Sequence, residues 1–139
     1  HVNIPVATVA RINEPWIAEE LIANEKCDMC MIGRPNLCDS EFANKAFEGK
    51  VDDIRPCIGC GRCLTGIMMG KRISCTVNPS VEDDTIAPVE TKKKVLVIGG
   101  GPAGMEAAYV AKKRGHEVVL CEKSNELGGQ LRLEVVPIA

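Results

Sequence analysis

Four cysteines gather in one short stretch near the middle of the chain. They follow the pattern C-x2-C-x2-C-x11-C, formed by Cys57, Cys60, Cys63 and Cys75. Three thiolates at three-residue steps let one loop wrap around a compact object, and the fourth returns from a distance to close the site. Cubane [4Fe–4S] clusters take four cysteine thiolates, whereas structural zinc more often uses two separated pairs. The spacing therefore favours an iron–sulfur cluster, and a zinc-stabilised interaction module is the alternative.

The residues around these cysteines suit a cluster. Gly59 and Gly61 let backbone N–H groups approach the sulfides, and Arg62 can offset the cluster charge. The remaining thiols are interpreted as core or surface residues: Cys27, Cys30, Cys38 and Cys121. If Cys27 and Cys30 lie along one strand, they point to opposite faces and cannot share a metal.

A second motif, G-x-G-x-x-G, covers residues 99–104. We expect a strand over 95–98 before it, a helix over 102–114 after it, and a further strand over 117–121 that ends at Glu122. This is the full sequence context of a dinucleotide-binding βαβ unit. The motif does not by itself separate FAD from NAD.

Each position of this motif has an expected role. Gly99 makes the tight turn, and Gly101 lets the backbone approach a pyrophosphate. Gly104, together with Ala107, permits close packing of helix on strand. The helix N-terminus offers unpaired N–H groups to phosphates. Glu122 is expected to accept hydrogen bonds from the adenosine ribose.

The first part of the chain alternates strand and helix patterns, which predicts parallel βα units. The expected elements are a strand over 4–12, a helix over 14–24 capped by Asn13, a strand over 28–32, and a helix over 40–48 that stops at Gly49. Arg11 and Gly33–Arg34 follow the ends of the two strands. In a (β/α)8 barrel the loops after strands 7 and 8 form a phosphate site. These residues then either hold a flavin phosphate, or Arg34 is a plain surface charge.

Composition narrows the class of protein. The chain has 139 residues, a net charge of −2, 45% hydrophobic and 26% charged residues, and only 3% aromatics. These values exclude wholesale disorder and argue against a basic, aromatic nucleic-acid surface. No apolar run is long enough to span a membrane and no signal peptide is visible, so we expect no membrane partner. We expect a reducing, cytoplasmic compartment in which thiolates bind metal and do not form disulfides.

The order of these motifs resembles the iron–sulfur flavoenzymes of the old yellow enzyme superfamily, the group of 2,4-dienoyl-CoA reductase, 2-enoate reductase and trimethylamine dehydrogenase. The resemblance runs over nearly the whole chain. The matching stretches are Ile-Pro-Val-Ala-Thr-Val-Ala-Arg-Ile at 4–12, Met-Ile-Gly-Arg-Pro at 31–35, Ile-Arg-Pro-Cys-Ile-Gly-Cys at 54–60, Cys-Thr-Val-Asn-Pro at 75–79, the segment 95–108 and Glu-Leu-Gly-Gly-Gln-Leu at 126–131.

This resemblance implies an α/β fold. Its parts are the last two βα units of an FMN-binding barrel (1–54), a [4Fe–4S] segment (55–80), a linker (81–93) and the first βαβ of a Rossmann-like FAD/NAD(P)-binding domain (94–139). It places Ala10, Arg11, Gly33 and Arg34 near the FMN phosphate and makes Cys57, Cys60, Cys63 and Cys75 the cluster ligands. The residues implied for FAD, or for ADP alone, are Gly99, Gly101, Pro102, Ala103, Gly104, Glu122, Lys123, Gly129 and Gln130.

The implied activity is NAD(P)H-dependent reduction of an activated C=C bond in a small unsaturated substrate, with electrons passing from NADH or NADPH through FAD and the cluster to FMN. Amine dehydrogenation by the same family is the alternative. The oligomeric state stays open, a homo-oligomer included. The chain begins without Met and in mid-pattern, so we expect it to be part of a longer enzyme and to be inactive alone. The family's proton donors lie outside it, and no catalytic residue is assigned within it.

Overall fold

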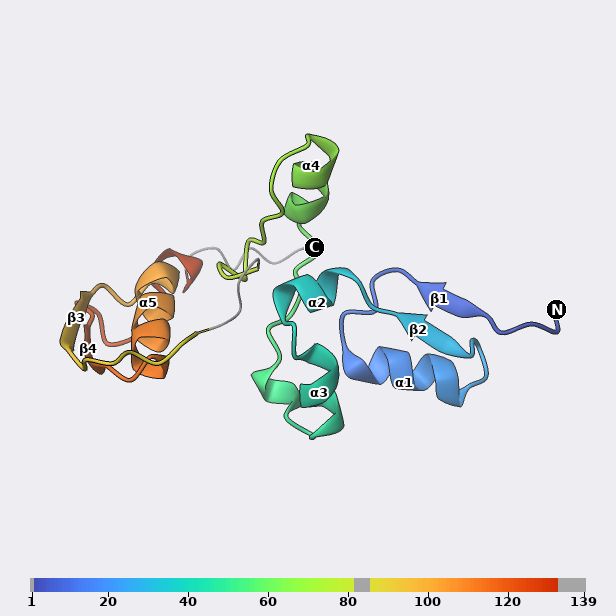
Figure 1. Cartoon of the computed structure of the whole chain (residues 1–139), viewed down its shortest axis with the longest axis horizontal. Coiled ribbons are helices and arrows are strands. Elements are labelled where there is room, and N and C mark those ends of the chain that lie inside the picture. Colours follow the sequence, from blue (N-terminus) through green and yellow to red (C-terminus); the bar gives the residue numbers. More distant parts are fainter. Residues whose placement is uncertain (1, 82–85, 133–139) are drawn as a thin grey trace. The chain divides into compact units, whose positions relative to one another are not determined.

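The computed structural model describes residues 2–81 and 86–132. The chain forms two compact units, His1–Asp84 and Thr85–Ala139 (Figure 1). Each unit contains one pair of parallel strands, and the helix that connects them packs against the pair. The predicted α/β class with parallel βα connections is therefore confirmed, because parallel neighbours need such a crossover helix.

The first unit opens with strand β1 (Ala7–Val9), helix α1 (Pro15–Ala23) and strand β2 (Met29–Met31). β1 pairs with β2 in parallel, with Thr8 opposite Cys30. Both strands are shorter than the predicted 4–12 and 28–32. At its start β1 follows Pro5, which has no N–H to give to a ladder, and at its end Ala10 takes a positive φ that leaves the extended conformation.

The predicted capping of α1 by Asn13 is wrong. Glu14 occupies the N-cap position without a side-chain cap bond, and Pro15 takes an early helical position as expected. The amide of Asn13 instead donates to the carbonyl oxygen of Cys57 at 3.3 Å. The side chain therefore ties the loop after β1 to the cysteine segment.

Four short helices follow β2: α2 (Arg34–Cys38), α3 (Phe42–Phe47), the 3-10 turn η1 (Val51–Asp53) and α4 (Arg62–Met68). The predicted helix over 40–48 corresponds to α3, and Gly49 follows with φ +72°. Helices α2 and α4 were not expected. The cysteine spacing predicts one loop that carries three thiolates, yet Cys63 lies within α4, so thiol placement there uses a helical turn.

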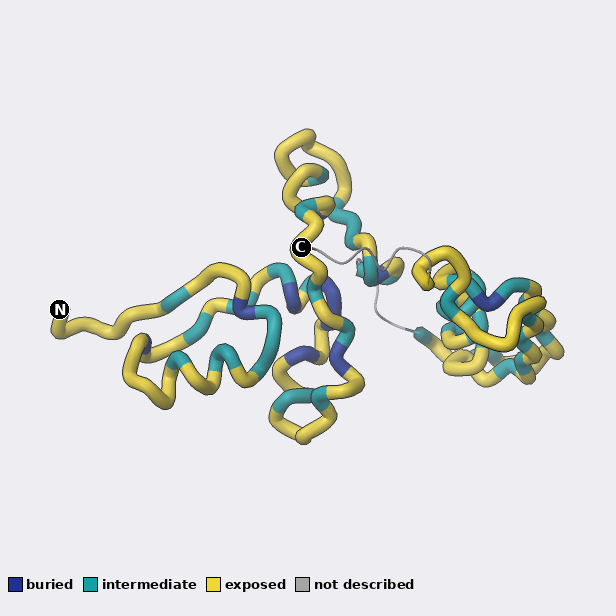
Figure 2. The backbone as a smooth tube through the Cα atoms, turned by 180° about the vertical axis from the view of Figure 1, so that it is seen from behind, coloured by how far each residue is buried: buried dark blue, intermediate teal, exposed yellow. Residues whose placement is uncertain are grey.

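Most buried residues of this unit lie where α2, α3 and the segment after η1 meet (Figure 2). Phe42, only 2% exposed, is the most buried side chain, and Cys38 and Ile54 are also buried. By contrast, Val9 on β1 and Met31 on β2 are more than half exposed. The packed part of the first unit is therefore the part that leads into the cysteines.

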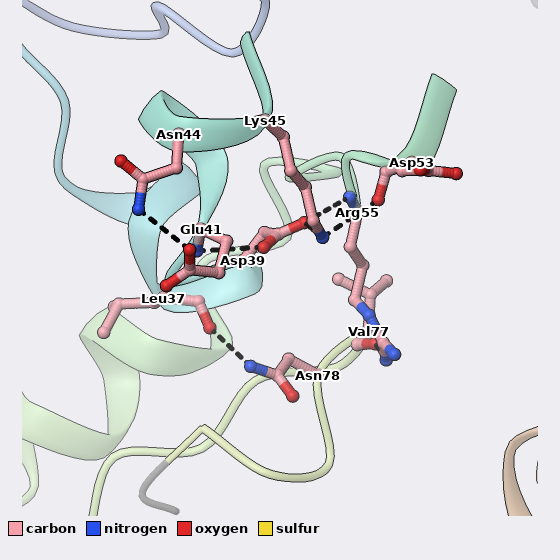
Figure 3. Close-up of polar contacts among 9 residues, drawn as sticks. All are labelled: Leu37, Asp39, Glu41, Asn44, Lys45, Asp53, Arg55, Val77 and Asn78. Carbon is pink, nitrogen blue, oxygen red and sulfur yellow. Dashed lines mark hydrogen bonds and ion pairs between the residues drawn. The ribbon is translucent and has the colours of Figure 1, made fainter. Parts of the chain in front are cut away.

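A buried carboxylate, Asp39, stands at the centre of this packed part (Figure 3). It accepts hydrogen bonds from Lys45 Nζ at 2.6 Å, from the Arg55 backbone N–H at 2.9 Å and from the Glu41 backbone N–H at 3.1 Å. Burial raises the pKa of Asp39, but the Lys45 ammonium and the two backbone donors outweigh it and hold the pKa below its usual value. The carboxylate joins the α2–α3 turn to the start of the cysteine segment.

Two further bonds fix the chain where it returns after α4 (Figure 3). The guanidinium of Arg55 donates to the carbonyl of Val77, and the buried amide of Asn78 donates to the carbonyl of Leu37 at 3.1 Å. The Asn78 side chain also accepts from the N–H of Ser80 at 2.9 Å. The return is therefore held against α2.

The second unit contains β3 (Lys94–Ile98), α5 (Pro102–Lys113), β4 (Glu117–Cys121) and the 3-10 turn η2 (Gly129–Arg132). The strands run parallel with Lys94 opposite Glu117 and Ile98 opposite Cys121. These bounds agree with the predicted elements to within one residue. Among the helices of the described residues, none is long and apolar enough to cross a membrane.

We predict that Asp39→Asn lowers the free energy of unfolding of the first unit by about 2 kcal/mol at pH 7, because three part-buried hydrogen bonds lose their charged acceptor. Since the folded pKa is lowered, this contribution is present above the unfolded-state pKa of about 3.9 and disappears as the pH falls through the folded pKa. Urea unfolding of wild type and variant should therefore converge in acid.

Glu48→Gln is the control for this substitution. Its ion pair with Lys50 leaves both side chains more than half exposed, so the loss should stay below about 0.5 kcal/mol. Equal effects of the two substitutions would contradict the role given to Asp39.

Candidate functional site

The structure brings the four predicted ligand cysteines to one pocket in the first unit. Cys57, Cys60, Cys63 and Cys75 line it together with Cys38, Arg34 and Arg62. Cys57 and Cys60 lie in the segment before α4, and Cys63 lies in the first turn of this helix. Cys75 lies in the segment that follows α4, where the hydrogen bond from Asn78 to Leu37 holds the chain. The residues that sequence spacing grouped are therefore neighbours in space.

The loop that carries the first three cysteines needs its glycines. Gly59 and Gly61 have φ of +69° and +75°, in the left-handed region that other residues adopt at a cost. Cys60 Sγ lies 3.2 Å from Thr76 Oγ1. Hydrogen bonds from Thr76 and from the Arg62 backbone lower the pKa of Cys60, which favours the thiolate that metal binding requires.

The donor set of this pocket fits a multi-atom cluster. Within the described residues, no three His, Cys, Asp or Glu side chains are close enough together to hold a single metal ion. A [4Fe–4S] cluster takes four cysteine thiolates, and the four cysteines predicted as its ligands line this one pocket. Two arginines at the pocket wall, Arg34 and Arg62, can offset its charge.

Cys38 is a member of this pocket that sequence reasoning missed. It is buried, as expected for a core thiol, but its Sγ lies 3.5 Å from Cys75 Sγ. Burial, with the neighbouring thiols of Cys75 and Cys57, raises the pKa of Cys38. Nothing in the local sequence separates Cys38 from a packing residue, because the contact depends on the distant return of the chain.

The C-x-x-C pair before and within β2 also differs from expectation. Cys27 lies before the strand, so the alternation rule does not separate it from Cys30, and their sulfurs are 3.9 Å apart. Burial, followed by the contact with Cys27, raises the pKa of Cys30. The two thiols therefore face one another inside the first unit.

The four residues predicted to lie near a flavin phosphate line a second pocket. Ala10, Arg11, Gly33 and Arg34 come from the loops after β1 and β2, and all four contribute to its wall. Arg34 lines the cysteine pocket as well. A Cβ added at Gly59 would lie 3.7 Å from Arg11 Nη2, so the Arg11 guanidinium also reaches the cysteine loop. The two pockets are neighbours that share the cationic side chain of Arg34.

The backbone at this second pocket is strained. Ala10 has φ +108° and Arg11 has φ +49°, although neither is glycine. Such conformations cost about 1–3 kcal/mol each and collect at ligand-binding turns. The strain turns the chain sharply after β1 and brings Arg11 to the pocket wall.

The glycine loop of the second unit has the geometry that its motif predicts. Gly99 has φ +107°, and its carbonyl oxygen would lie 1.9 Å from a Cβ at Gly104. Gly101, the N-cap of α5, has open space around its Cβ direction. Close packing thus requires glycine at 104, whereas the room beside Gly101 is what a phosphate group needs.

Glu122 follows β4 and turns back to the glycine loop. Its carboxylate accepts hydrogen bonds from the Gly100 N–H at 2.6 Å and from the Ser124 N–H at 2.9 Å. The bonds from Ser124 and Gly100 lower the pKa of Glu122 to about 2, so it is ionised at neutral pH. In this structure it orders the loop, and its expected ribose contact stays a prediction.

The remaining residues predicted for the nucleotide lie around the same loop. Gly128 donates its N–H to the Gly100 carbonyl at 2.8 Å, and a Cβ at Gly129 would be 3.1 Å from Gly101 Cα. Gln130 is exposed in η2, and Lys123 is exposed after Glu122. Pro102 and Ala103 form the exposed first turn of α5. The structure therefore gathers this set at one end of the βαβ unit.

Comparison with known proteins identifies a matching family and several similar proteins. Residues 94–138 match the family described as FAD dependent oxidoreductase. The chain is 48% identical to an NADH oxidase of Thermoanaerobacter brockii and 42% identical to a cinnamate reductase of Clostridium sporogenes, over 95% and 94% of its length. The solved structure of a 2-naphthoyl-CoA reductase with 2-naphthoyl-CoA covers 94% of the chain at a TM-score of 0.85 and 38% identity. Amine dehydrogenases are also among the similar proteins.

These relatives define the class: the chain is homologous to flavin oxidoreductases, with an FAD oxidoreductase segment at its C-terminal side. More narrowly, it is a homologue of the old yellow enzyme and trimethylamine dehydrogenase group, as the sequence motifs implied. The chain spans 21% of the NADH oxidase and 20% of the cinnamate reductase.

We predict that Gly104→Ala destabilises the second unit by more than about 3 kcal/mol, because the new methyl group meets the backbone oxygen of Gly99. Gly101→Ala is the matched control, since its methyl group enters open space at an ordinary φ of −74°. Thermal unfolding should separate the two. Equal unfolding temperatures would show that helix and strand are not in close contact at Gly104.

Proposed function

We propose that this chain is the cofactor-linking part of an NAD(P)H-dependent flavin and iron–sulfur oxidoreductase that reduces an activated C=C bond. Electrons pass from NAD(P)H through FAD and a [4Fe–4S] cluster to FMN. The observation that carries the proposal is the pair of neighbouring pockets, one lined by five thiols and one by Arg11 and Gly33, with Arg34 in the wall of both. The identities to an NADH oxidase and a cinnamate reductase support the same direction of reaction.

The residues of the first unit have distinct tasks in this proposal. When bound, a [4Fe–4S] cluster supplies one-electron transfer and a flavin supplies both hydride and one-electron exchange. Cys57, Cys60, Cys63 and Cys75 hold the cluster, and Thr76 keeps Cys60 ready to bind by donating a hydrogen bond. Arg11 and Arg34 neutralise a flavin phosphate in the second pocket, where a planar guanidinium matches phosphate oxygens.

The second unit binds the adenine nucleotide of FAD in this proposal. The free N–H groups at the start of α5 face the pyrophosphate, and Gly101 leaves room for it. Glu122 is ionised and accepts hydrogen bonds from the ribose when the cofactor is present. The segments 1–54 and 94–139 are accordingly proposed as the end of an FMN barrel and the start of an FAD domain, with 55–80 and 81–93 as the cluster segment and linker.

We predict that Cys60→Ser and Cys75→Ser, made in the protein at its full native length, lower bound iron and acid-labile sulfide by more than about tenfold. Serine is a poor ligand for an iron–sulfur cluster. NADH-driven C=C reduction should fall with the iron content. Cys121→Ser, at the exposed end of β4, is the control and should leave both unchanged.

Three outcomes would count against this assignment. An iron content equal to that of the wild type in the two variants would contradict the proposed set of cluster ligands. Unchanged NADH-driven reduction in a variant without iron would contradict the proposed electron path. Stoichiometric zinc in a colourless protein would support the zinc-stabilised interaction module instead. Broad absorbance at about 400 nm is expected for iron–sulfur.

We predict that Arg34→Gln weakens FMN binding by about tenfold or more, because one charge-assisted contact to phosphate is lost. The measurement is flavin released on dialysis, identified as FMN or FAD by chromatography. Lys50→Gln, which removes an exposed charge paired with Glu48, is the control. Loss of FAD in place of FMN from the Arg34 variant would contradict the assignment of this pocket.

Amine dehydrogenation is the second candidate, supported by the dimethylamine and histamine dehydrogenases among the similar proteins. The chain is 34% identical to each of these two dehydrogenases and 42% identical to the cinnamate reductase. Amine dehydrogenation therefore ranks second to C=C reduction. Steady-state assays with an enoate and NADH, and with a methylated amine and an artificial acceptor, distinguish the two directions.

A further inference from the structure

We propose that Cys38 and Cys75 form a reversible disulfide when the cysteine pocket holds no cluster, and that this bond blocks reloading until it is reduced. The inference rests on the proposed cluster site. Its starting observation is the 3.5 Å separation of the two sulfurs. A disulfide bond is about 2.05 Å long, so the sulfurs need to approach by only about 1.5 Å.

The chain on either side of both cysteines is already held in place. Leu37, next to Cys38, accepts a hydrogen bond from Asn78, and Asp39 on its other side accepts one from the Arg55 N–H. The Arg55 guanidinium in turn donates to Val77, which lies two residues after Cys75 (Figure 3). These bonds keep the two thiols opposite each other without help from a bound group.

Their exposure sets the order of reaction. Cys75 is partly exposed, whereas Cys38 is buried and only 4% exposed. The Cys75 thiolate therefore attacks an external disulfide first, here oxidised glutathione, and releases one glutathione thiol. The Cys38 thiol then loses its proton and attacks the Cys75 sulfur, which forms the Cys38–Cys75 bond and releases the second glutathione as a thiol. Two protein thiols are oxidised, one external disulfide is reduced, and two hydrogens move to glutathione.

The bond and the cluster exclude one another. Cys75 is the fourth cluster ligand in the proposed function, and a sulfur in a disulfide cannot serve as a thiolate ligand. Iron bound to Cys75 conversely protects it from the external disulfide. Cys38 thus acts as the resolving thiol that converts a bare pocket into a closed, reducible form.

The test uses the protein at its full native length, purified without oxygen, and compares cluster-loaded with chelator-stripped samples. Both are exposed to oxidised glutathione, alkylated and digested with trypsin without reduction. Arg34 and Arg55 precede proline and resist cleavage, so Cys38 and Cys75 fall on different peptides. Peptide 27–45 carries Cys38 together with Cys27 and Cys30, 51–62 carries Cys57 and Cys60, 63–71 carries Cys63, and 73–92 carries Cys75.

The expected result is a linked pair of peptides 27–45 and 73–92 in the stripped sample, at least tenfold more abundant than in the loaded one. Cys38→Ala should lose this link and leave glutathione attached to peptide 73–92. Cys27→Ala removes another thiol from the same peptide and should keep the link. Wild type that carries the link should take up iron and sulfide only after treatment with dithiothreitol.

Three results would overturn the proposal. They are a link from 73–92 to 51–62 or 63–71 in place of 27–45, a link that persists in Cys38→Ala, and a Cys75 that stays fully alkylated after glutathione treatment. Iron content of the purified variants, measured first, shows whether Cys38→Ala folds around its cluster. Cys38→Ser serves if the alanine variant does not. Absence of iron from the wild type would instead count against the proposed function.

Discussion

The buried Asp39 carboxylate is the interaction on which the cysteine pocket depends. It receives three hydrogen bonds, one each from a residue before, within and after the α3 helix, and the last of these donors, Arg55, also holds the chain where it returns with Cys75. A charged acceptor at such a position is worth more than a neutral one, because the hydrogen bonds that it accepts are charge-assisted. The apolar core around Phe42 is small, so this polar network contributes much of the local order.

In the proposed function, one short segment serves two nucleotide-binding parts. Helix α4 and the left-handed glycines before it position three of the thiols. The hydrogen-bond network of Asp39 and Arg55 holds the segment that carries the fourth thiol, Cys75. Arg34, at the start of α2, lies in the wall of both pockets of the first unit. A single helix of five residues therefore carries both Arg34 and the pocket thiol Cys38.

Much of this could be predicted from local sequence. The predictions of the strand over 117–121 and of the helix that begins at Pro102 are confirmed, because the periodicity and the end signals of these segments agree. Gly99 and Gly104 also have the structural roles that the motif predicts. Three features depend on partners far away in the sequence and could not be predicted locally. Asn13 bonds to a residue 44 positions away in place of capping α1, Cys38 contacts Cys75, which is 37 positions away, and Asp39 accepts from a residue 16 positions away. Helix α4 was missed because its seven residues hold cysteine, glycine and threonine without a clear apolar face.

The most direct test of the central claim is Mössbauer spectroscopy on the protein at full native length, purified without oxygen from cells grown on isotope-enriched iron. The account predicts four tetrahedral, sulfur-coordinated irons of mixed valence for each chain, the signature of one [4Fe–4S] cluster. A single isolated ferrous or ferric site in the wild type, or iron that stays bound when Cys57, Cys60, Cys63 and Cys75 are all replaced by serine, would contradict it.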